Sequence, residues 1–248
     1  MAHGSQKPKP DFSLLQLLPN ALTIIALCAG LTSIRFGVQG NYELAVQFIM
    51  AACVLDGLDG RLARLMGTDS EIGAELDSLS DFLNFGIAPA LILYYWGLSD
   101  IGRTGWIFVL IFAVCCVLRL ARFNVSSKSD SSDYNAAYFE GVPAPAGALL
   151  VMLPMYVSFA FADVPLMPGI VICAYMAFVG LLLISRVPTW SFKKTKVSRE
   201  NVKFFLVGVA LTGAAVLTFA WATLIVLCLG YVGVVIWAWI DRETPNSR

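Results

Sequence analysis

Histidine and charge are both scarce in this chain of 248 residues. The only histidine is His3, which argues against a histidine-based metal site or a histidine general base anywhere else. Charged residues make up 14% of the chain, whereas ordinary soluble domains have about 25%. The six cysteines lie in apolar runs without any C-x-x-C spacing, so zinc and redox motifs are also disfavoured. A soluble enzyme built on histidine or cysteine chemistry is therefore not expected.

Long apolar runs take up most of the chain, which is 58% hydrophobic. A helix needs about 20 apolar residues to cross a bilayer, and without the alternation of a β-barrel the spans must be helical. We therefore predict an all-α fold, a polytopic helical membrane protein with about eight transmembrane helices. A tight turn near Ala220–Thr223 divides the last apolar block. The predicted spans are residues 18–36, 42–64, 76–97, 104–124, 144–162, 167–185, 203–219 and 222–240.

The basic residues indicate how these spans are oriented. Of the 17 lysines and arginines, only Arg35 and Arg103 fall on the side of the membrane opposite to both termini. Basic residues favour the cytoplasmic side, so both termini are predicted to be cytoplasmic. The cytoplasmic membrane of a prokaryote is the expected location.

The stretch "LDGLDGRLARLMGTDSEIGAELDSLSDFLNFG" (residues 55–86) concentrates acidic residues at the cytoplasmic ends of the second and third spans. At 100° per residue, its polar and small side chains form one stripe on each helix. Two antiparallel helices can turn these stripes toward each other, which would bring four carboxylates together. The stripes are Asp56, Asp59, Gly60 and Ala63 on one helix, and Gly73, Asp77, Asp81 and Asn84 on the next.

Four neighbouring carboxylates would repel each other, and their desolvation would cost several kcal/mol each. Divalent cations remove this cost, and oxygen ligands without histidine or cysteine favour Mg²⁺, Mn²⁺ or Ca²⁺. Two such ions form a clamp for a phosphate-containing substrate, to which Arg64 can add a bidentate contact. The simpler interpretation, aspartates as solvated helix caps, explains one or two of the four residues.

The run Asp56-x2-Asp59-Gly60-x2-Ala63-Arg64-x8-Gly73-x3-Asp77-x3-Asp81 resembles the full signature of the CDP-alcohol phosphatidyltransferase family. The resemblance implies a catalytic core of six helices. We therefore expect a cytosolic tail and interfacial helix over residues 1–17, the catalytic core over residues 18–200, and two additional transmembrane helices with a short tail over residues 201–248.

The resemblance also implies roles for individual residues. Asp56, Asp59, Asp77 and Asp81 would bind two Mg²⁺ or Mn²⁺ ions, and Asp81 would also be the catalytic base that deprotonates the acceptor hydroxyl. CDP-diacylglycerol would be the phosphatidyl donor. The residues expected to contact its nucleotide are Asn20, Thr23, Gly60, Ala63, Arg64, Ser70 and Gly73.

Two further stretches bear on the acceptor alcohol. "LRLARFNV" (residues 118–125) and "YFEGVPAPAGA" (residues 138–148) resemble the branch of the family that uses L-serine. Serine has a carboxylate that needs a basic partner, and Arg122, Asn124 and Arg186 are the predicted acceptor-binding residues. For Arg119 and Arg122, the alternative is that the side chain merely extends to the membrane surface.

Other functions stay open at this point. The same chemistry could use glycerol 3-phosphate, choline or inositol phosphate as acceptor. An ion transporter is a more distant alternative, because transporter carboxylates tend to lie near the membrane midplane in repeated halves, whereas these aspartates occur once and near one face. We also expect a homodimer, with membrane lipids and no nucleic acid as partners.

Overall fold

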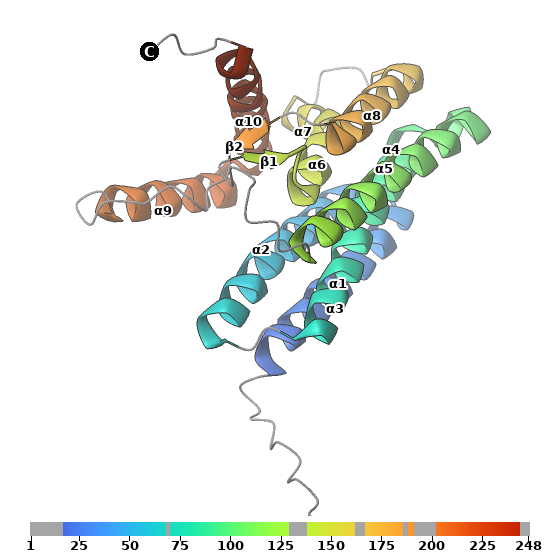
Figure 1. The fold of residues 1–248 in the computed structure, drawn as a ribbon. Coiled ribbons are helices and arrows are strands. Elements are labelled where there is room, and N and C mark those ends of the chain that lie inside the picture. Colours follow the sequence, from blue (N-terminus) through green and yellow to red (C-terminus); the bar gives the residue numbers. More distant parts are fainter. Residues whose placement is uncertain are drawn as a thin grey trace, which may run out of the picture.

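The computed structural model describes residues 17–67, 70–128, 138–161, 167–185, 188–190 and 202–243. These residues are almost entirely helical (Figure 1). The predicted interfacial helix before residue 17 lies outside the described residues. The helices are α1 (Leu18–Val38), α2 (Tyr42–Met66), α3 (Glu71–Asp81), η2 (Phe82–Ile87), α4 (Ala88–Gly97), η3 (Ser99–Ile101), α5 (Arg103–Lys128), α6 (Ala144–Val151), α7 (Leu153–Ala160), α8 (Gly169–Ile184), α9 (Val202–Thr218) and α10 (Ala220–Glu243).

The prediction of a polytopic helical membrane protein is confirmed. Within the described part of the chain, four helical segments are long and apolar enough to cross a bilayer: Leu18–Val38, Glu71–Gly97, Arg103–Ser126 and Ala220–Ile240. The segment Gly169–Ile184 is apolar but shorter. All eight predicted spans fall on helical segments, whereas the number that cross the membrane stays a prediction.

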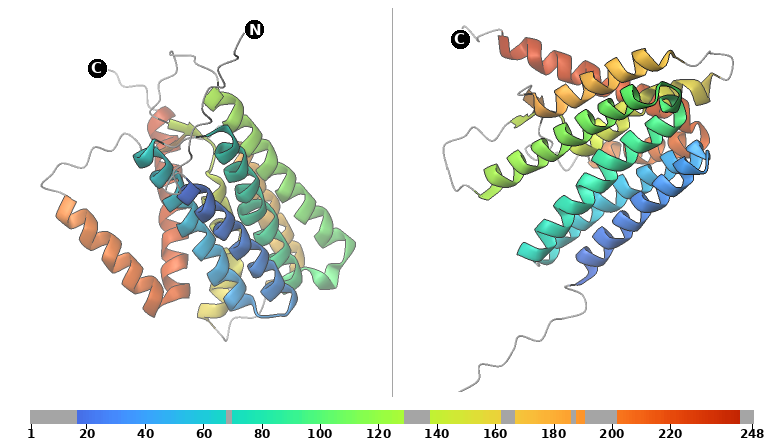
Figure 2. Two further views of the ribbon diagram at one scale, coloured as in Figure 1. Left: turned by 90° about the horizontal axis from the view of Figure 1, so that it is seen from below. Right: turned by 90° about the vertical axis from the view of Figure 1, so that its right-hand side faces the viewer.

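The first five α-helices form the bundle that holds the aspartates, and local sequence signals determine where its helices begin and end. The side chain of Asn41 caps α2 by accepting a hydrogen bond from Leu44 N, and Gly67 ends that helix at a positive φ of 60°. Ser70 then caps α3. Helix α3 continues through the π-helical turn η2 into α4, so that residues 71–97 form one rod (Figure 2).

The predicted fifth span, residues 144–162, is interrupted. It consists of α6 and α7, separated at Met152. Pro154 explains this difference, because proline has no backbone N–H and its ring excludes the carbonyl four residues earlier, that of Leu150. Two side chains from other helices satisfy the carbonyls at the break: the hydroxyl of Tyr175 donates to Leu150 O at 2.8 Å, and the thiol of Cys228 donates to Leu149 O at 3.6 Å.

The last two helices differ in how they pack. Helix α10 lies against α6 and α7, whereas α9 packs against α10 and stands apart from the bundle, as Figure 1 and the left view of Figure 2 show. The predicted turn between them is placed slightly too late: α9 ends at Thr218, α10 begins at Ala220, and Phe219 alone separates them.

One element was not predicted. Strand β1 (Tyr138–Glu140) pairs antiparallel with β2 (Pro188–Trp190), with Phe139 opposite Thr189. This short ribbon joins the segment that enters α6 to the segment that follows α8. It has no apolar alternation long enough to reveal a strand in the sequence.

Candidate active site

The four aspartates lie together where α2 and α3 face each other. One carboxylate oxygen from each of Asp56, Asp59 and Asp77 lies within 4.8 Å of the others. The fourth, Asp81, lies one turn further along α3, near enough for its carboxyl group and that of Asp56 to influence each other. The two helices therefore meet in the register that the two stripes predict.

This cluster has the properties of a divalent cation site. Asp81 has an oxygen, Oδ1, that is buried and has no hydrogen-bond partner among the described residues. A buried carboxylate oxygen without a donor is costly unless a cation binds it. All the candidate ligands are carboxylate oxygens, which suit Mg²⁺, Mn²⁺ or Ca²⁺ and do not favour zinc. The residues present thus fit the predicted metal ions.

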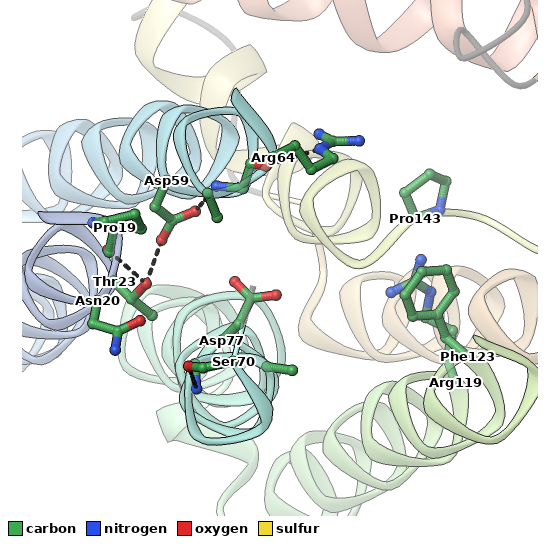
Figure 3. A pocket seen from close by; sticks show the side chains of 14 residues that line it. Pro19, Asn20, Thr23, Asp59, Arg64, Ser70, Asp77, Arg119, Phe123 and Pro143 are labelled. Carbon is green, nitrogen blue, oxygen red and sulfur yellow. Dashed lines mark hydrogen bonds between the residues drawn. The ribbon is translucent and has the colours of Figure 1, made fainter. Parts of the chain in front are cut away.

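A cavity of about 480 Å³ opens beside the aspartates (Figure 3). All seven residues predicted to contact the nucleotide line it, although this gathering does not test their individual roles. Further residues of the lining were not predicted. The complete lining is Pro19, Asn20, Thr23, Asp59, Gly60, Ala63, Arg64, Ser70, Gly73, Ala74, Asp77, Arg119, Phe123 and Pro143.

A chain of hydrogen bonds ties α1 to this cavity. Thr23 donates from its hydroxyl to Asp59 Oδ2 at 2.6 Å. Ser80, on α3, donates to the backbone carbonyl of Thr23 at 3.4 Å, and Asn84 donates to the Ser80 hydroxyl at 3.1 Å. Asn84 fits against α1 because residue 30 is glycine, where a Cβ atom would collide with the amide oxygen of Asn84. Small and polar residues thus fix the position of Asp59 relative to α3.

Two glycines of the motif meet different surroundings. A Cβ atom on Gly73 would lie 2.9 Å from the amide oxygen of Asn20 and 3.0 Å from the hydroxyl of Ser70, so a side chain at this position would have to displace these two groups. A Cβ atom on Gly60 would meet nothing within 4 Å and would project into open space. Gly60 therefore leaves its backbone accessible to a bulky anion, whereas Gly73 permits close packing against α1.

Helix α5 provides the opposite side of the cavity. Arg119 and Phe123 line it there (Figure 3), with the guanidinium carbon of Arg119 5.7 Å from the centre of the Phe123 ring. The positive charge of Arg119 also acts on Asp56 and Asp81. Arg119 was not among the predicted site residues. Its spacing of four residues from Phe123, which puts both on one helix face, was the available signal.

The predicted acceptor-binding residues lie elsewhere. Arg122 donates to the backbone carbonyls of Ile184 and Ser185, each at 3.2 Å, at the end of α8. Asn124 donates to the hydroxyl of Ser78 at 2.9 Å. Neither residue lines the cavity, and Arg186 lies outside the described residues. Their predicted contact with the acceptor stays a prediction.

A helical membrane protein with a carboxylate cluster beside a cavity lined by glycines and arginines has the features of a membrane-embedded enzyme that acts on a phosphate-containing substrate. The sequence matches the family described as CDP-alcohol phosphatidyltransferase over residues 16–181, and the chain belongs to this family. It is therefore a transferase, from a family that depends on metal ions in general.

Several named proteins are similar in sequence to this chain over most of its length. A protein of Mycobacterium leprae (strain TN) named CDP-diacylglycerol–serine O-phosphatidyltransferase is 39% identical over 219 residues, which cover 88% of this chain and 73% of that protein. The protein of the same name from Mycobacterium tuberculosis (strain ATCC 25618 / H37Rv) is 36% identical over 219 residues, which cover 88% of this chain and 76% of that protein. The protein of the same name from Helicobacter pylori (strain ATCC 700392 / 26695) is 35% identical over 192 residues, which cover 77% of this chain and 78% of that protein.

Proposed function

We propose that this enzyme transfers the phosphatidyl group of CDP-diacylglycerol to L-serine, giving phosphatidylserine and CMP. The supporting observation is the convergence of Asp56, Asp59 and Asp77 beside a cavity lined by the motif's glycines and Arg64. Relatives with 35–39% identity are named CDP-diacylglycerol–serine O-phosphatidyltransferase, which supports serine as the acceptor.

In this proposal Asp56, Asp59, Asp77 and Asp81 hold two divalent cations, Mg²⁺ or Mn²⁺. Bound there, the ions would neutralise the diphosphate and the charge that develops on it during transfer. Arg64, in the last turn of α2, is positioned to bind phosphate oxygens. Its Nε atom donates to Gly60 O at 2.8 Å, which holds the guanidinium along the helix.

The acceptor hydroxyl attacks the phosphorus of the phosphatidyl group, and the bond from this phosphorus to the CMP oxygen breaks. The proton of the hydroxyl passes to Asp81, which the family resemblance implies as base and which is a carboxylate in a site without histidine. Arg119, across the cavity, can bind the serine carboxylate through two parallel N–H donors. Pro143 and Phe123 narrow the same side of the cavity.

The decisive experiment supplies CDP-diacylglycerol to the purified enzyme in detergent or vesicles together with serine, glycerol 3-phosphate, choline or inositol phosphate in turn. We expect CMP release and a new phospholipid with serine alone. Chelator should abolish both, and added Mg²⁺ or Mn²⁺ should restore them. Turnover with another alcohol and none with serine would overturn the acceptor while leaving the family chemistry in place.

We further propose that the site faces the cytoplasm, as the distribution of basic residues predicts. The cavity lies beside the Gly67 end of α2 and the Ser70 end of α3. A reporter fused after Arg248 should be active in the cytoplasm. Activity on the outer side alone would contradict this orientation.

A further inference from the structure

Two buried polar side chains on α3 and η2 have no part in the proposed reaction. Ser80 and Asn84 are 3% and 1% exposed, respectively. Both side chains lie on the side that packs against α1, whereas Asp77 lies with the cation ligands of α2. Polar groups in an apolar interior are costly, so these two residues call for an explanation.

Thr23 on α1 connects these two side chains to the cation site. The amide nitrogen of Asn84 donates to the hydroxyl of Ser80 at 3.1 Å, and this hydroxyl donates to the backbone carbonyl of Thr23 at 3.4 Å. The hydroxyl of Thr23 has a single hydrogen, and its nearer acceptor is Asp59 Oδ2 at 2.6 Å rather than Pro19 O at 3.2 Å. A relay of hydrogen bonds, Asn84–Ser80–Thr23, therefore runs from η2 through α1 to a cation ligand on α2.

The far end of this relay is fixed by the close approach of two helices. The amide oxygen of Asn84 is buried, has no hydrogen-bond partner in the described part of the chain, and lies against residue 30, where any Cβ atom would collide with it. Gly30 thus sets the orientation of this amide. Asn84 also lies in the π-helical turn η2, and such turns are frequent at functional sites. An amide kept here with an unpaired oxygen indicates that its N–H donor has a function.

Asp59, at the near end of the relay, is fixed through both of its carboxylate oxygens. It is 3% exposed; Oδ1 accepts from the backbone N–H of Gly60, and Oδ2 accepts from Thr23. A carboxylate with a donor on each oxygen cannot readily rotate. Mg²⁺ demands near-ideal octahedral geometry, whereas Ca²⁺ takes more oxygen ligands in flexible geometry and can bind both oxygens of one carboxylate. A fixed carboxylate therefore favours the smaller ion.

We propose that Ser80 and Asn84 are positioning residues for the cation site. Acting through Thr23, they hold the Asp59 carboxylate in one orientation, and this rigidity favours Mg²⁺ or Mn²⁺ over Ca²⁺. The inference rests on the two-cation site of the proposed function, but not on the identity of the acceptor. It gives two residues that are not part of the aspartate signature a role in the choice of metal ion.

Cation affinity, measured without substrates, is the direct test. The purified enzyme in detergent is titrated with Mn²⁺, whose unbound fraction is read by electron paramagnetic resonance, and Mg²⁺ and Ca²⁺ are measured by competition. Ser80→Ala breaks the relay, and the loss of one hydrogen bond corresponds to a change of about three- to tenfold. We expect the affinities for Mn²⁺ and Mg²⁺ to fall by that factor and the affinity for Ca²⁺ to stay within about twofold.

A serine on α1 provides the matched control. Ser33 is also buried, but its hydroxyl donates to Gly30 O within its own helix at 2.6 Å. Ser33→Ala should therefore leave all three affinities unchanged. Two variants of Thr23 separate its hydroxyl from its volume. Thr23→Ser retains the hydroxyl and should keep the preference for Mg²⁺, whereas Thr23→Val removes the donor to a cation ligand and should weaken Mg²⁺ binding about 10- to 100-fold.

Two glycines on α1 give a test that leaves every polar group of the relay in place. A Cβ atom on Gly30 would press on the Asn84 amide, whereas one on Gly37 would meet Ile92 Cγ1 at 3.0 Å. Both Gly30→Ala and Gly37→Ala should lower the thermal unfolding midpoint. Only Gly30→Ala should also lower the ratio of Mg²⁺ to Ca²⁺ affinity.

Three outcomes would overturn the inference: an unchanged Mg²⁺ affinity in Ser80→Ala, an equal loss of Mg²⁺ and Ca²⁺ affinity in that variant, or an equal shift of the ratio in Ser33→Ala. Mn²⁺ binding by the wild type without serine-dependent CMP release would refute serine as the acceptor, while the variants still decide the inference. An absence of Mn²⁺ binding by the wild type would refute the two-cation site and the inference with it.

Discussion

The two sides of the cavity have contrasting chemistry. The α2–α3 side consists of helix faces rich in aspartate and glycine, whose groups lie close together and contact α1 through Thr23. The α5 side consists of Arg119 and Phe123 with Pro143 beside them. The first side suits cations and a diphosphate, and the second suits a small anionic acceptor. The contrast indicates that donor and acceptor are recognised by different helices.

The largest expected effect comes from the α2–α3 side. Asp59→Asn, Asp56→Asn and Asp77→Asn should each lower kcat on the order of a hundredfold or more, because a cation ligand is lost. CMP release at saturating substrates is the measurement. Asp100→Asn, an exposed aspartate in η3, is the matched control and should keep full activity. Normal activity in any of the three cluster variants would contradict the two-cation site.

A smaller and more selective effect is expected on the α5 side. Arg119→Ala should raise the KM for serine roughly a hundredfold while changing that for CDP-diacylglycerol little, because a charge-assisted bidentate contact is lost. Arg122→Ala should chiefly lower the thermal unfolding midpoint, since Arg122 donates to carbonyls at the end of α8. If Arg122→Ala has the larger effect on the serine KM, the prediction from sequence is right and Arg119 is not the acceptor ligand.

Gly60 and Gly73, both on the α2–α3 side, should respond differently to substitution by alanine. Gly60→Ala should raise stability by about 0.5–1 kcal/mol, as alanine does in helices, yet lower affinity for the CDP-lipid about tenfold by filling the open space. Gly73→Ala should lower stability and activity together, because its Cβ atom would press on Asn20 and Ser70. Thermal unfolding and the KM for CDP-diacylglycerol separate these outcomes. Equal behaviour of the two variants would contradict the assignment of open space to Gly60.

The smallest effect concerns a hydrogen bond between α3 and α5, from Asn124 to Ser78. Ser78→Ala removes the hydroxyl that accepts from Asn124, which should cost about 1 kcal/mol of stability and leave both KM values within about twofold. Chemical or thermal unfolding is the measurement. A large rise in the serine KM would instead support the predicted role of Asn124 in acceptor binding.

The gathering of the motif residues was predictable because helix periodicity alone places Asp56, Asp59, Asp77 and Asp81 on facing stripes. Periodicity did not predict that Arg119 lines the cavity whereas Arg122 binds backbone carbonyls. Both arginines occur in the same short run, and only the packing of α8 determines which one meets backbone carbonyls.

Other features of the fold depend on contacts between residues that are far apart in the sequence. Pro154 signals a helix break, but whether the helix bends or stops depends on the partners that Tyr175 and Cys228 supply. The π-helical turn after Asp81 likewise has no local signal in its sequence, "FLNFGI". The β1–β2 ribbon joins segments about fifty residues apart, which no local pattern could reveal.

The break between α6 and α7 has a consequence for how the chain is assembled in the membrane. A backbone carbonyl without a donor is costly in the bilayer interior. The donors for Leu149 and Leu150 come from α10 and α8, which are synthesised later. The α6–α7 segment therefore reaches its final state only after the last helix has inserted. Ribosomal stalling or truncation before Cys228 should leave the carbonyl of Leu149 without this donor and expose the nascent chain to membrane quality control.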